Sequence, residues 1–276
     1  MQKSVVELEK ALKKEKIVAL LAPSFIVEFS FPSIINQLKK LGFKKVVELT
    51  FGAKMVNREY HKILSNTSSL VISSTCPGIM ETLKLKMPQY IKNLAKIDSP
   101  MVASAKICKN LWKGYKTCFI SPCNFKKVEA ENSVHIDYVI DYQELESLFE
   151  KNKIQQNNKK ADFDKFYNEY TRIYPLSGGL SKTAHLKGIL KKEEAKTIDG
   201  ISDVLLFLQH PNKKVRFLDC TFCKGGCIGG PHIKDKSLAK KKKKLVNYLN
   251  KSKAMCIPPL KKGIIKKAEG ISFIKS

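Results

Sequence analysis

The stretch that decides the fold is Cys220-Thr-Phe-Cys223-Lys-Gly-Gly-Cys227-Ile-Gly-Gly-Pro231, which is rich in cysteine and glycine. It follows an apolar run at residues 215–218 that predicts a short β-strand. The glycines between the last two cysteines let the backbone curl and aim its N–H groups at bound sulfide. The stretch therefore predicts a strand that ends in a loop suited to a metal–sulfur group.

Two other cysteines stand in the same arrangement. Cys76 follows a strand predicted at residues 69–73 and precedes a proline, so it would be the N-cap of a helix, where the dipole favours a thiolate. Cys123 follows a strand predicted at residues 119–121. The carboxyl ends of parallel strands meet at one sheet edge, so we expect the three loops to meet there. They would supply the four thiolates that a 4Fe–4S cubane takes, namely those of Cys76, Cys123, Cys223 and Cys227.

Strands and helices alternate along the chain, which predicts an α/β fold with mostly parallel sheets flanked by helices. The run at residues 17–21 is apolar throughout, as in a strand buried on both faces. Further strands are predicted at residues 46–49, 69–73, 119–121, 138–140 and 215–218. Helices are predicted at residues 3–14, 32–42, 57–64, 79–95, 99–112, 143–152, 180–191, 201–209 and 237–250.

Composition excludes several classes of protein. The chain has 276 residues, of which 43% are hydrophobic, so it buries a core and is not disordered throughout. No apolar run approaches the roughly 20 residues of a membrane span, and none near the start is long enough for a secretory signal. We therefore expect a cytoplasmic protein without a membrane partner. Eight cysteines in a reducing cytosol indicate metal or redox chemistry rather than structural disulfides.

The formal charge of +26, from 51 basic and 25 acidic residues, by itself favours a nucleic-acid partner. Only Arg58, Arg172 and Arg216 are arginines, however, and arginine is the side chain that grips phosphate or guanine with two hydrogen bonds. We therefore expect nucleic acid not to be the main partner. The lysine run at residues 240–244 is interpreted as a solvated helix face or, alternatively, as a docking surface for an acidic redox partner.

A local zinc site is the second interpretation of the cysteine-rich stretch. The spacing of its four ligands resembles that of a zinc knuckle, with Cys220, Cys223, Cys227 and His232 as the set. Spacing alone leaves this site and the cubane both open. The remaining cysteines have apolar neighbours or lie in a strand and are interpreted as small buried hydrophobes, namely Cys108, Cys118 and Cys256.

Eight stretches occur in an order that matches a known family. They are Leu21-Ala-Pro-Ser-Phe-Ile-Val-Glu-Phe29, Leu38-Lys-Lys-Leu-Gly-Phe-Lys-Lys-Val46, Ser73-Ser-Thr-Cys76-Pro-Gly78, Ser99-Pro-Met101, Ser121-Pro-Cys123-Asn-Phe-Lys126-Lys-Val-Glu129-Ala130, Asp137-Tyr-Val-Ile-Asp-Tyr-Gln-Glu-Leu-Glu146, Ser177-Gly-Gly179 and Cys223-Lys-Gly-Gly-Cys227-Ile-Gly-Gly230. Over roughly residues 15–232 the chain thus resembles the C-terminal domain of the large subunit of iron-only (FeFe) hydrogenases.

The resemblance implies a two-lobed α/β domain with the metal site between the lobes. It implies that the four cysteines Cys76, Cys123, Cys223 and Cys227 hold a 4Fe–4S cubane, and that Cys227 bridges to a two-iron subcluster carrying CO and cyanide.

The resemblance also implies which residues would surround the two-iron subcluster. Lys126 corresponds to the lysine that hydrogen-bonds a cyanide, and Glu129 is an acid that this sequence keeps. If the subcluster binds, these two residues take part in catalysis. The backbone segments that correspond to the lining of the pocket are Ala22, Pro23, Ser177, Gly178 and Gly179.

The sequence departs from the pattern of active members around that pocket. Thr75 stands where active members carry a proton-relaying cysteine, and a hydroxyl is a poor relay acid at pH 7. Ser121 and Thr221 replace methionines, and Met101 replaces a glutamine. One acid survives in the stretch at residues 57–63, where the family has several.

Intact cubane ligands and an altered pocket predict a 4Fe–4S-binding, hydrogenase-like protein that senses redox state or hydrogen, or relays electrons, with weak or no hydrogen turnover. Lys126 argues for binding of the two-iron subcluster, and the departures argue against it. The alternatives are an active, ferredoxin-dependent FeFe hydrogenase that interconverts protons and H2, a cytosolic iron–sulfur assembly factor, and a zinc or nucleic-acid binding module.

The same resemblance predicts the domain organisation and the partner of the protein. We expect an N-terminal helix at residues 1–14, the hydrogenase-like domain at residues 15–236 with a divide between lobes near residue 120, and a lysine-rich extension at residues 237–276. The ferredoxin modules common in the family do not occur in this sequence. We therefore expect an acidic, ferredoxin-like electron carrier or a signalling protein as the partner.

Overall fold

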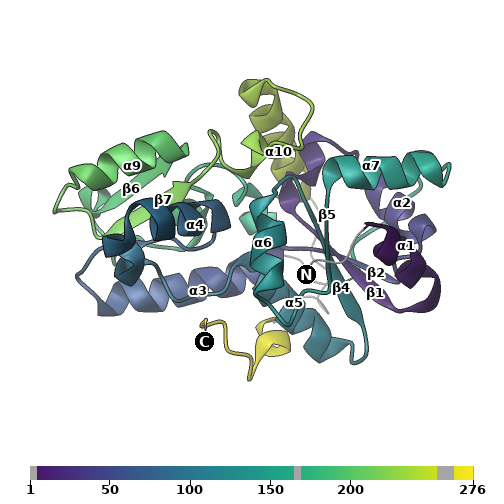
Figure 1. The fold of residues 1–276 in the computed structure, drawn as a ribbon, viewed down its shortest axis with the longest axis horizontal. Helices are drawn as coiled ribbons and strands as arrows, with labels where there is room; N and C mark the ends of the chain where they lie inside the picture. The colour runs from purple at the N-terminus through teal and green to yellow at the C-terminus, as the bar shows by residue number, and fades with distance from the viewer. Residues whose placement is uncertain (1–4, 165–168, 254–263, 276) are drawn as a thin grey trace.

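The computed structural model describes residues 5–164, 169–253 and 264–275. Its strands form two sheets, one in each half of the molecule (Figure 1). The first sheet has the strand order β2 (Lys45–Glu48), β1 (Ile17–Leu21), β4 (Lys116–Ser121) and β5 (Tyr138–Asp141), and the second has the order β3 (Val71–Ile72), β7 (Phe217–Thr221) and β6 (Ala195–Asp199). All of these pairings are parallel. The predicted α/β fold with mostly parallel sheets is confirmed.

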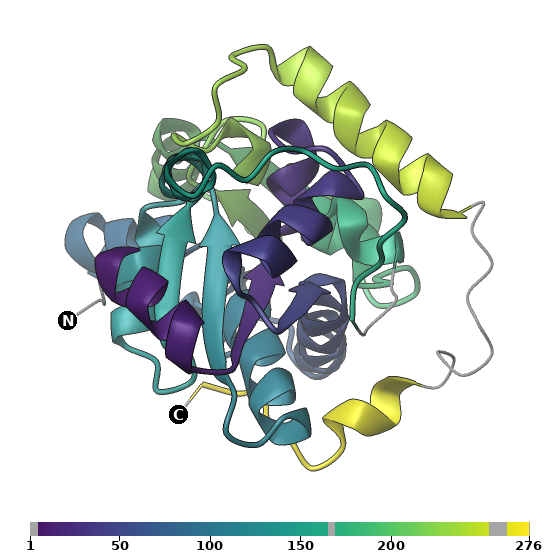
Figure 2. The same cartoon turned by 90° about the vertical axis from the view of Figure 1, so that its right-hand side faces the viewer.

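The first sheet is buried on both faces, as the apolar sequence of β1 predicts. On one side of β1, Ile17, Ala19 and Leu21 pack in a core shared with four α-helices, and on the other side Val18 and Leu20 belong to a second core. The α-helices of the first core are α1 (Val5–Lys14), α2 (Ser33–Leu41), α7 (Tyr142–Lys151) and α10 (Leu238–Lys253). Helix α5 (Pro100–Leu111) covers the opposite face, and Figure 2 shows this layer from the side.

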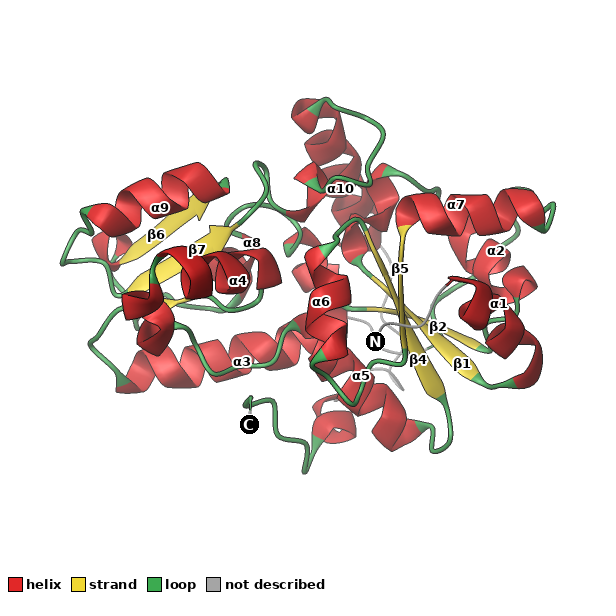
Figure 3. Ribbon diagram, viewed as in Figure 1, coloured by secondary structure: helices red, strands yellow, loops and turns green. Residues whose placement is uncertain are grey.

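The second sheet has its own small core. Leu218 and Cys220 of β7 pack with residues of α4 (Pro77–Lys86) and α9 (Ile201–Gln209) on one face. Phe217 points to the other face, where its ring lies 5.7 Å from that of Tyr60 on α3 (Thr50–Asn66). Figure 3 shows the two groups of strands separated by helices.

The lobes are interleaved along the chain, so the expected divide near residue 120 does not separate them. β3 precedes that point but belongs to the second sheet, and β5 follows it but belongs to the first. Helix α10 (Leu238–Lys253) packs on three short 3-10 helices, η1 (Pro23–Val27), η3 (Glu169–Ile173) and η5 (Cys227–Gly229). None of the helices in the described residues is long and apolar enough to cross a lipid bilayer.

Several predicted elements differ from the observed ones. The helix predicted at residues 79–95 breaks at Pro88 into α4 and the 3-10 helix η2 (Pro88–Asn93), because proline cannot continue the hydrogen-bond ladder. The helix predicted at residues 180–191 is only α8 (Gly179–Thr183), since His185 and Gly188 adopt positive φ. Helix α6 (Phe125–Glu131), the 3-10 helices η4 (Lys192–Glu194) and η7 (Ile264–Ala268) and strand β6 were not predicted. Cys256, interpreted as a buried hydrophobe, lies outside the described residues.

Candidate functional site

The cysteine-bearing loops leave the carboxyl ends of three strands, but these strands belong to two sheets. Cys76 follows β3, and Cys223 and Cys227 follow β7, in the second sheet. Cys123 follows β4 in the first sheet. The expectation that the loops meet at one sheet edge is therefore wrong in detail. They approach each other from the two lobes.

Aromatic packing and close backbone contacts fix these loops against one another. Phe125 from the first lobe and Phe222 from the second have ring centroids 4.8 Å apart. A Cβ atom at Gly78 would come within 2.8 Å of the Phe125 ring, so the start of α4 packs directly on this pair. Gly226 has a φ of +82°, and a Cβ there would lie 2.4 Å from the carbonyl oxygen of Pro175. Only glycine fits this position, which holds the third loop close to its neighbour.

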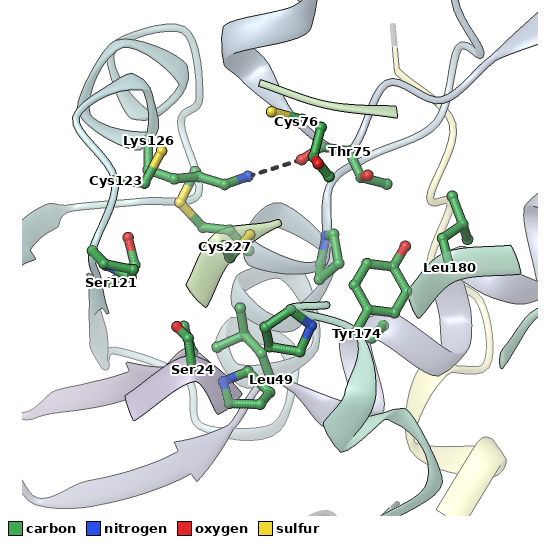
Figure 4. A pocket seen from close by; sticks show the side chains of 18 of the residues that line it. Ser24, Leu49, Thr75, Cys76, Ser121, Cys123, Lys126, Tyr174, Leu180 and Cys227 are labelled. Atoms are coloured by element: carbon green, nitrogen blue, oxygen red, sulfur yellow. Dashed lines mark hydrogen bonds between the residues drawn. The ribbon is translucent and has the colours of Figure 1, made fainter. Parts of the chain in front are cut away.

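A cavity lies between the lobes at the place where these loops approach (Figure 4). The volume of this cavity is about 100 Å³. Cys76, Cys123 and Cys227 line it, and Cys223 lies beside them. Cys227 is exposed, although it lies between the two lobes. The space that its side chain borders is the cavity. Three thiols therefore border a space with room for a further group.

Burial and repulsion between neighbouring sulfurs raise the pKa of Cys123, Cys223 and Cys227. Burial raises the pKa of Cys223 to about 12, with a contribution from the neighbouring Cys123 and Cys76. The pKa of Cys227 is raised first by burial and then by the other three cysteines, and that of Cys123 by burial and by Cys76. Four thiols that repel each other as thiolates would be stabilised by a group of positively charged metal ions placed among them.

The described side chains do not form a site for a single metal ion. Within the described residues, no three His, Cys, Asp or Glu side chains converge closely enough to hold one metal ion. Four thiols that lie near one another at the cavity, yet do not form a site for one ion, fit a group of several metal ions. Four thiolates are the donor set of a 4Fe–4S cluster, so the residues present fit that group.

The local zinc site is wrong, because two of its four members point elsewhere. The N–H of Cys220 donates to Ser73 Oγ at 3.0 Å, and the Cys220 side chain is buried in the core of the second lobe. The Nδ1 atom of His232 lies 3.3 Å from Gln143 Oε1, and its Nε2 contacts the side chain of Asn124. Alternation along β7 turns Cys220 away from the cavity.

Lys126 points from α6 toward the cavity, as Figure 4 shows. Its Nζ lies 2.5 Å from Glu129 Oε2 and donates to the carbonyl oxygen of Thr75 at 3.3 Å. Burial alone would lower the pKa of Lys126, but the Glu129 carboxylate, together with Cys123 and Cys227, raises it overall. Lys126 is therefore a fixed cation at the cavity wall, and Glu129 holds it in place.

The other residues predicted around the pocket divide into two groups. Ala22 and Pro23 line the cavity. Ser177, Gly178 and Gly179 do not line it, and the N–H of Ser177 instead donates to a carbonyl oxygen of the third cysteine loop at 3.4 Å. This second segment therefore positions the loop rather than forming the wall of the cavity.

The four single-residue departures that the resemblance implies lie at the cavity, whereas the altered stretch at residues 57–63 does not line it. Thr75, Met101, Ser121 and Thr221 line it together with the cysteines. The Ser121 Oγ atom is buried and has no hydrogen-bond partner among the described residues. The sequence changes are therefore concentrated on the surface that would face a bound group.

Sequence reasoning missed two polar residues that line the same cavity, Asp219 and Tyr174. Asp219 is 3% exposed, and the hydroxyl of Tyr174 is also buried. The only sequence signal for Asp219 is an acid inside the apolar strand Phe217-Leu-Asp-Cys220. Tyr174 gives no signal, because it lies in an irregular segment outside the cysteine motifs.

Comparison with known proteins gives matches at the level of sequence. Residues 15–231 match the family model of the C-terminal domain of the iron only hydrogenase large subunit. Iron hydrogenase 1 of Clostridium pasteurianum is 24% identical, with 75% of this chain and 46% of that protein covered. The cytosolic Fe-S cluster assembly factor NAR1 of Encephalitozoon cuniculi is 22% identical, with 70% and 59% covered. The chain spans about half the length of these curated relatives.

Solved structures share the fold. A variant of the FeFe-hydrogenase HydA1 from Chlamydomonas reinhardtii has a TM-score of 0.72 at 17% identity, covering 98% of this chain and 95% of that chain. A HydA structure titled for the stepwise assembly of its H-cluster has a TM-score of 0.70 at 17% identity, with 98% and 95% covered. At these identities the likeness supports the fold alone.

Proposed function

Because this chain belongs to the family defined by the C-terminal domain of the iron-only hydrogenase large subunit, we propose that it binds a 4Fe–4S cluster between its lobes. We propose that the cluster serves to relay electrons or to sense redox state or hydrogen, with little or no hydrogen turnover. The observation that carries this proposal is the approach of four cysteines to a cavity whose other walls depart from the pattern of active members.

Four residues would hold the cluster in this proposal: Cys76, Cys123, Cys223 and Cys227. A 4Fe–4S cluster bound there would accept and release one electron at a time. The N–H of Phe222 already donates to Cys76 Sγ at 3.4 Å. Backbone N–H groups of Phe125 and Lys126 lower the pKa of Cys123, although burial raises it more. Such donors stabilise negative charge on the sulfurs and so favour the reduced cluster.

Low turnover is supported by the chemistry of the cavity wall. Thr75 offers a hydroxyl where the family pattern has a thiol, and a hydroxyl gives up its proton far less readily near pH 7. Lys126 is already engaged by Glu129 and by the Thr75 carbonyl. A ligand on a two-iron subcluster would have to compete with both contacts for this cation.

A hydrogen-evolution assay tests this part of the proposal. The anaerobically reconstituted protein is supplied with a synthetic two-iron cofactor and with dithionite-reduced methyl viologen, beside a hydrogenase of the family as the reference. We expect a rate at least about a hundredfold below the reference, since a missing general acid costs about 10²–10⁴-fold. The Thr75→Cys variant should gain activity relative to the wild type if the subcluster binds. Wild-type turnover equal to the reference would identify a working hydrogenase instead.

We propose an acidic, ferredoxin-like electron carrier or signalling protein as the partner. The net charge of +26 would attract an acidic protein over long range. The face of α10 that carries Lys242 and Lys243 is exposed, and α10 packs on η5, which begins at Cys227. Binding of an acidic ferredoxin should weaken steeply as salt is added.

An iron–sulfur assembly factor is the second candidate. It is supported by the 22% identity with the assembly factor NAR1, which covers 70% of this chain. Mixing the cluster-loaded protein with a cluster-free iron–sulfur protein separates the two candidates. Transfer of the cluster to the acceptor would favour assembly, and retention of the cluster through repeated reduction and oxidation would favour electron relay.

A further inference from the structure

Asp219 is a buried acid at the cavity that the proposed cluster ligation does not use. It is 3% exposed and lines the same cavity as Cys76 and Cys227. Its neighbours in β7, Leu218 and Cys220, pack into the core of the second lobe. Because side chains alternate along a strand, Asp219 is directed to the opposite side, where the cavity lies.

The surroundings of Asp219 leave its negative charge poorly compensated. Its Oδ2 atom accepts a hydrogen bond from the N–H of Ser181 at 2.8 Å. In the part of the chain that the structure describes, no lysine, arginine or histidine forms an ion pair with it, and Lys182 acts only from a distance. Burial raises the pKa of Asp219, and the contacts with Ser181 and Lys182 oppose this only in part.

The other titratable groups that face Asp219 are neutral when protonated. They are Tyr60 on α3, Tyr174 after η3, and Cys220 on the same strand. Burial raises the pKa of each of them, so none supplies or loses a proton across the neutral range. Asp219 is therefore the member of this group whose pKa is shifted upward toward the neutral range, whereas the pKa values of the others are shifted away from it.

A carboxyl in such a place responds to charge in the cavity. A buried carboxylate without a cationic partner is costly and readily takes up a proton instead. An electron added to a group in the same cavity places further negative charge nearby, in a medium where charges interact more strongly than in water. Negative charge of this kind raises the affinity of a carboxylate for a proton.

We propose that Asp219 takes up a proton when the redox group bound in the cavity takes up an electron, so that the two uptakes are coupled. This inference rests on the proposed function, since it needs a redox group at the four cysteines. A one-electron donor, either dithionite or an iron–sulfur electron carrier, supplies the electron. Water supplies the proton, which forms an O–H bond on the Asp219 carboxylate. Reoxidation removes the electron, breaks that O–H bond and returns the proton to water.

The test is a redox titration of the anaerobically loaded protein, followed by electron paramagnetic resonance at several pH values across the neutral range. In the wild type, we expect the midpoint potential to become more negative as the pH rises, because the proton that stabilises the reduced state becomes harder to obtain. The Asp219→Asn variant should show a midpoint potential that does not change with pH. Asp98→Asn is the matched control, since Asp98 is another buried carboxyl, which pairs with Lys106 at 2.6 Å instead of lining the cavity. It should keep the wild-type slope.

The outcomes separate this inference from the proposed function. A wild type whose midpoint potential does not depend on pH, or an Asp219→Asn variant with the wild-type slope, overturns the role of Asp219 alone. A protein that holds no redox-active group overturns the proposed function and this inference with it. If Asp219→Asn does not fold, Asp219→Glu keeps a carboxyl in a shifted position and should move the pH range of the slope. An unchanged range in that variant also overturns the inference.

Discussion

Cys220 and Cys223 share one motif, yet strand geometry gives them different surroundings. Cys220 is 1% exposed and packs beside Ser73, whereas the pKa of Cys223 responds to Cys76 and Cys123. We therefore expect Cys76→Ser or Cys123→Ser to abolish the brown iron–sulfur absorbance of the anaerobic protein, while Cys220→Ser leaves it nearly unchanged. His232→Ala should also keep the cluster. Loss of absorbance in Cys220→Ser together with its survival in Cys76→Ser would contradict the ligand set.

Lys126 and Glu129 form a buried ion pair, with side chains 12% and 11% exposed. Removing one partner of such a pair leaves a buried charge without compensation, which costs about 3–5 kcal/mol. We expect Lys126→Met to lower the free energy of unfolding of the cluster-free protein by about this amount in urea denaturation. The double variant Lys126→Met/Glu129→Gln should recover a large part of the loss, because no lone charge remains.

A matched control for this pair lies on α4, where Lys84 and Glu81 have the same spacing but side chains 48% and 34% exposed. Exposed pairs contribute about 0–1 kcal/mol, so Lys84→Met should change the urea midpoint little. Equal effects of Lys126→Met and Lys84→Met would mean that burial of the Lys126 pair does not matter.

At the scale of elements, Asp141 connects β5 to α7 through a capping box. Its Oδ1 accepts from the N–H groups of Gln143 and Glu144 at 3.0 and 2.9 Å, and its Oδ2 accepts from Lys127 Nζ at 3.0 Å. We expect Asp141→Ala to lower the free energy of unfolding by about 1–2 kcal/mol, because the first turn of α7 loses its cap. Asp141→Asn keeps an acceptor at the cap and loses only the charge, so its loss should be smaller.

The pH dependence of the Asp141 contribution follows from its pKa. Burial alone would raise this pKa, but hydrogen bonds from the Glu144 backbone and Lys127 lower it below the usual 3.8. A carboxyl whose pKa is lower in the folded state stabilises the fold fully above its unfolded pKa and loses that contribution as the pH falls through the folded pKa. The stability difference between wild type and Asp141→Asn should therefore be constant near neutral pH and shrink below about pH 4. A difference that grows on acidification would contradict the assignment.

Most elements could be predicted from the sequence, because their signals are local. The apolar run of β1 and the proline and cysteine at the start of α4 each indicate one structure. β6 gave no such signal, since its residues Ala195–Asp199 are half-exposed and polar at the edge of a sheet. Helix α8 is shorter than predicted because His185 adopts a positive φ, and the helix propensities of the residues do not predict that conformation.

The positions of the candidate ligands at strand ends were predictable from the sequence, and the geometry of the candidate site was not. The strand-end position of each cysteine follows from sequence, but the distribution of the strands between two sheets depends on long-range pairing. Asp219 becomes visible only when the direction of each side chain in β7 is known. Tyr174 depends on how an irregular segment packs, and local pattern carries no information about this.

At the scale of the whole molecule, the charge of +26 must be confined to one compact chain. Like charges repel more in the folded state, and raising salt from about 0.1 M to about 1 M shortens the Debye length from about 10 Å to about 3 Å. We therefore expect the melting temperature to rise with sodium chloride. The double variant Lys242→Glu/Lys243→Glu, on the exposed face of α10, should show a smaller rise. A melting temperature that falls with salt would mean that attractive ion pairs dominate.

The central claim is that two interleaved lobes bring four distant sulfurs around one metal–sulfur group. Counting iron and acid-labile sulfide in the anaerobically reconstituted protein, with electron paramagnetic resonance of the reduced sample, tests it most directly. We expect about four iron and about four sulfide per chain and the signal of a reduced 4Fe–4S cluster. A protein that binds zinc in place of iron, or remains colourless and free of sulfide, would contradict it.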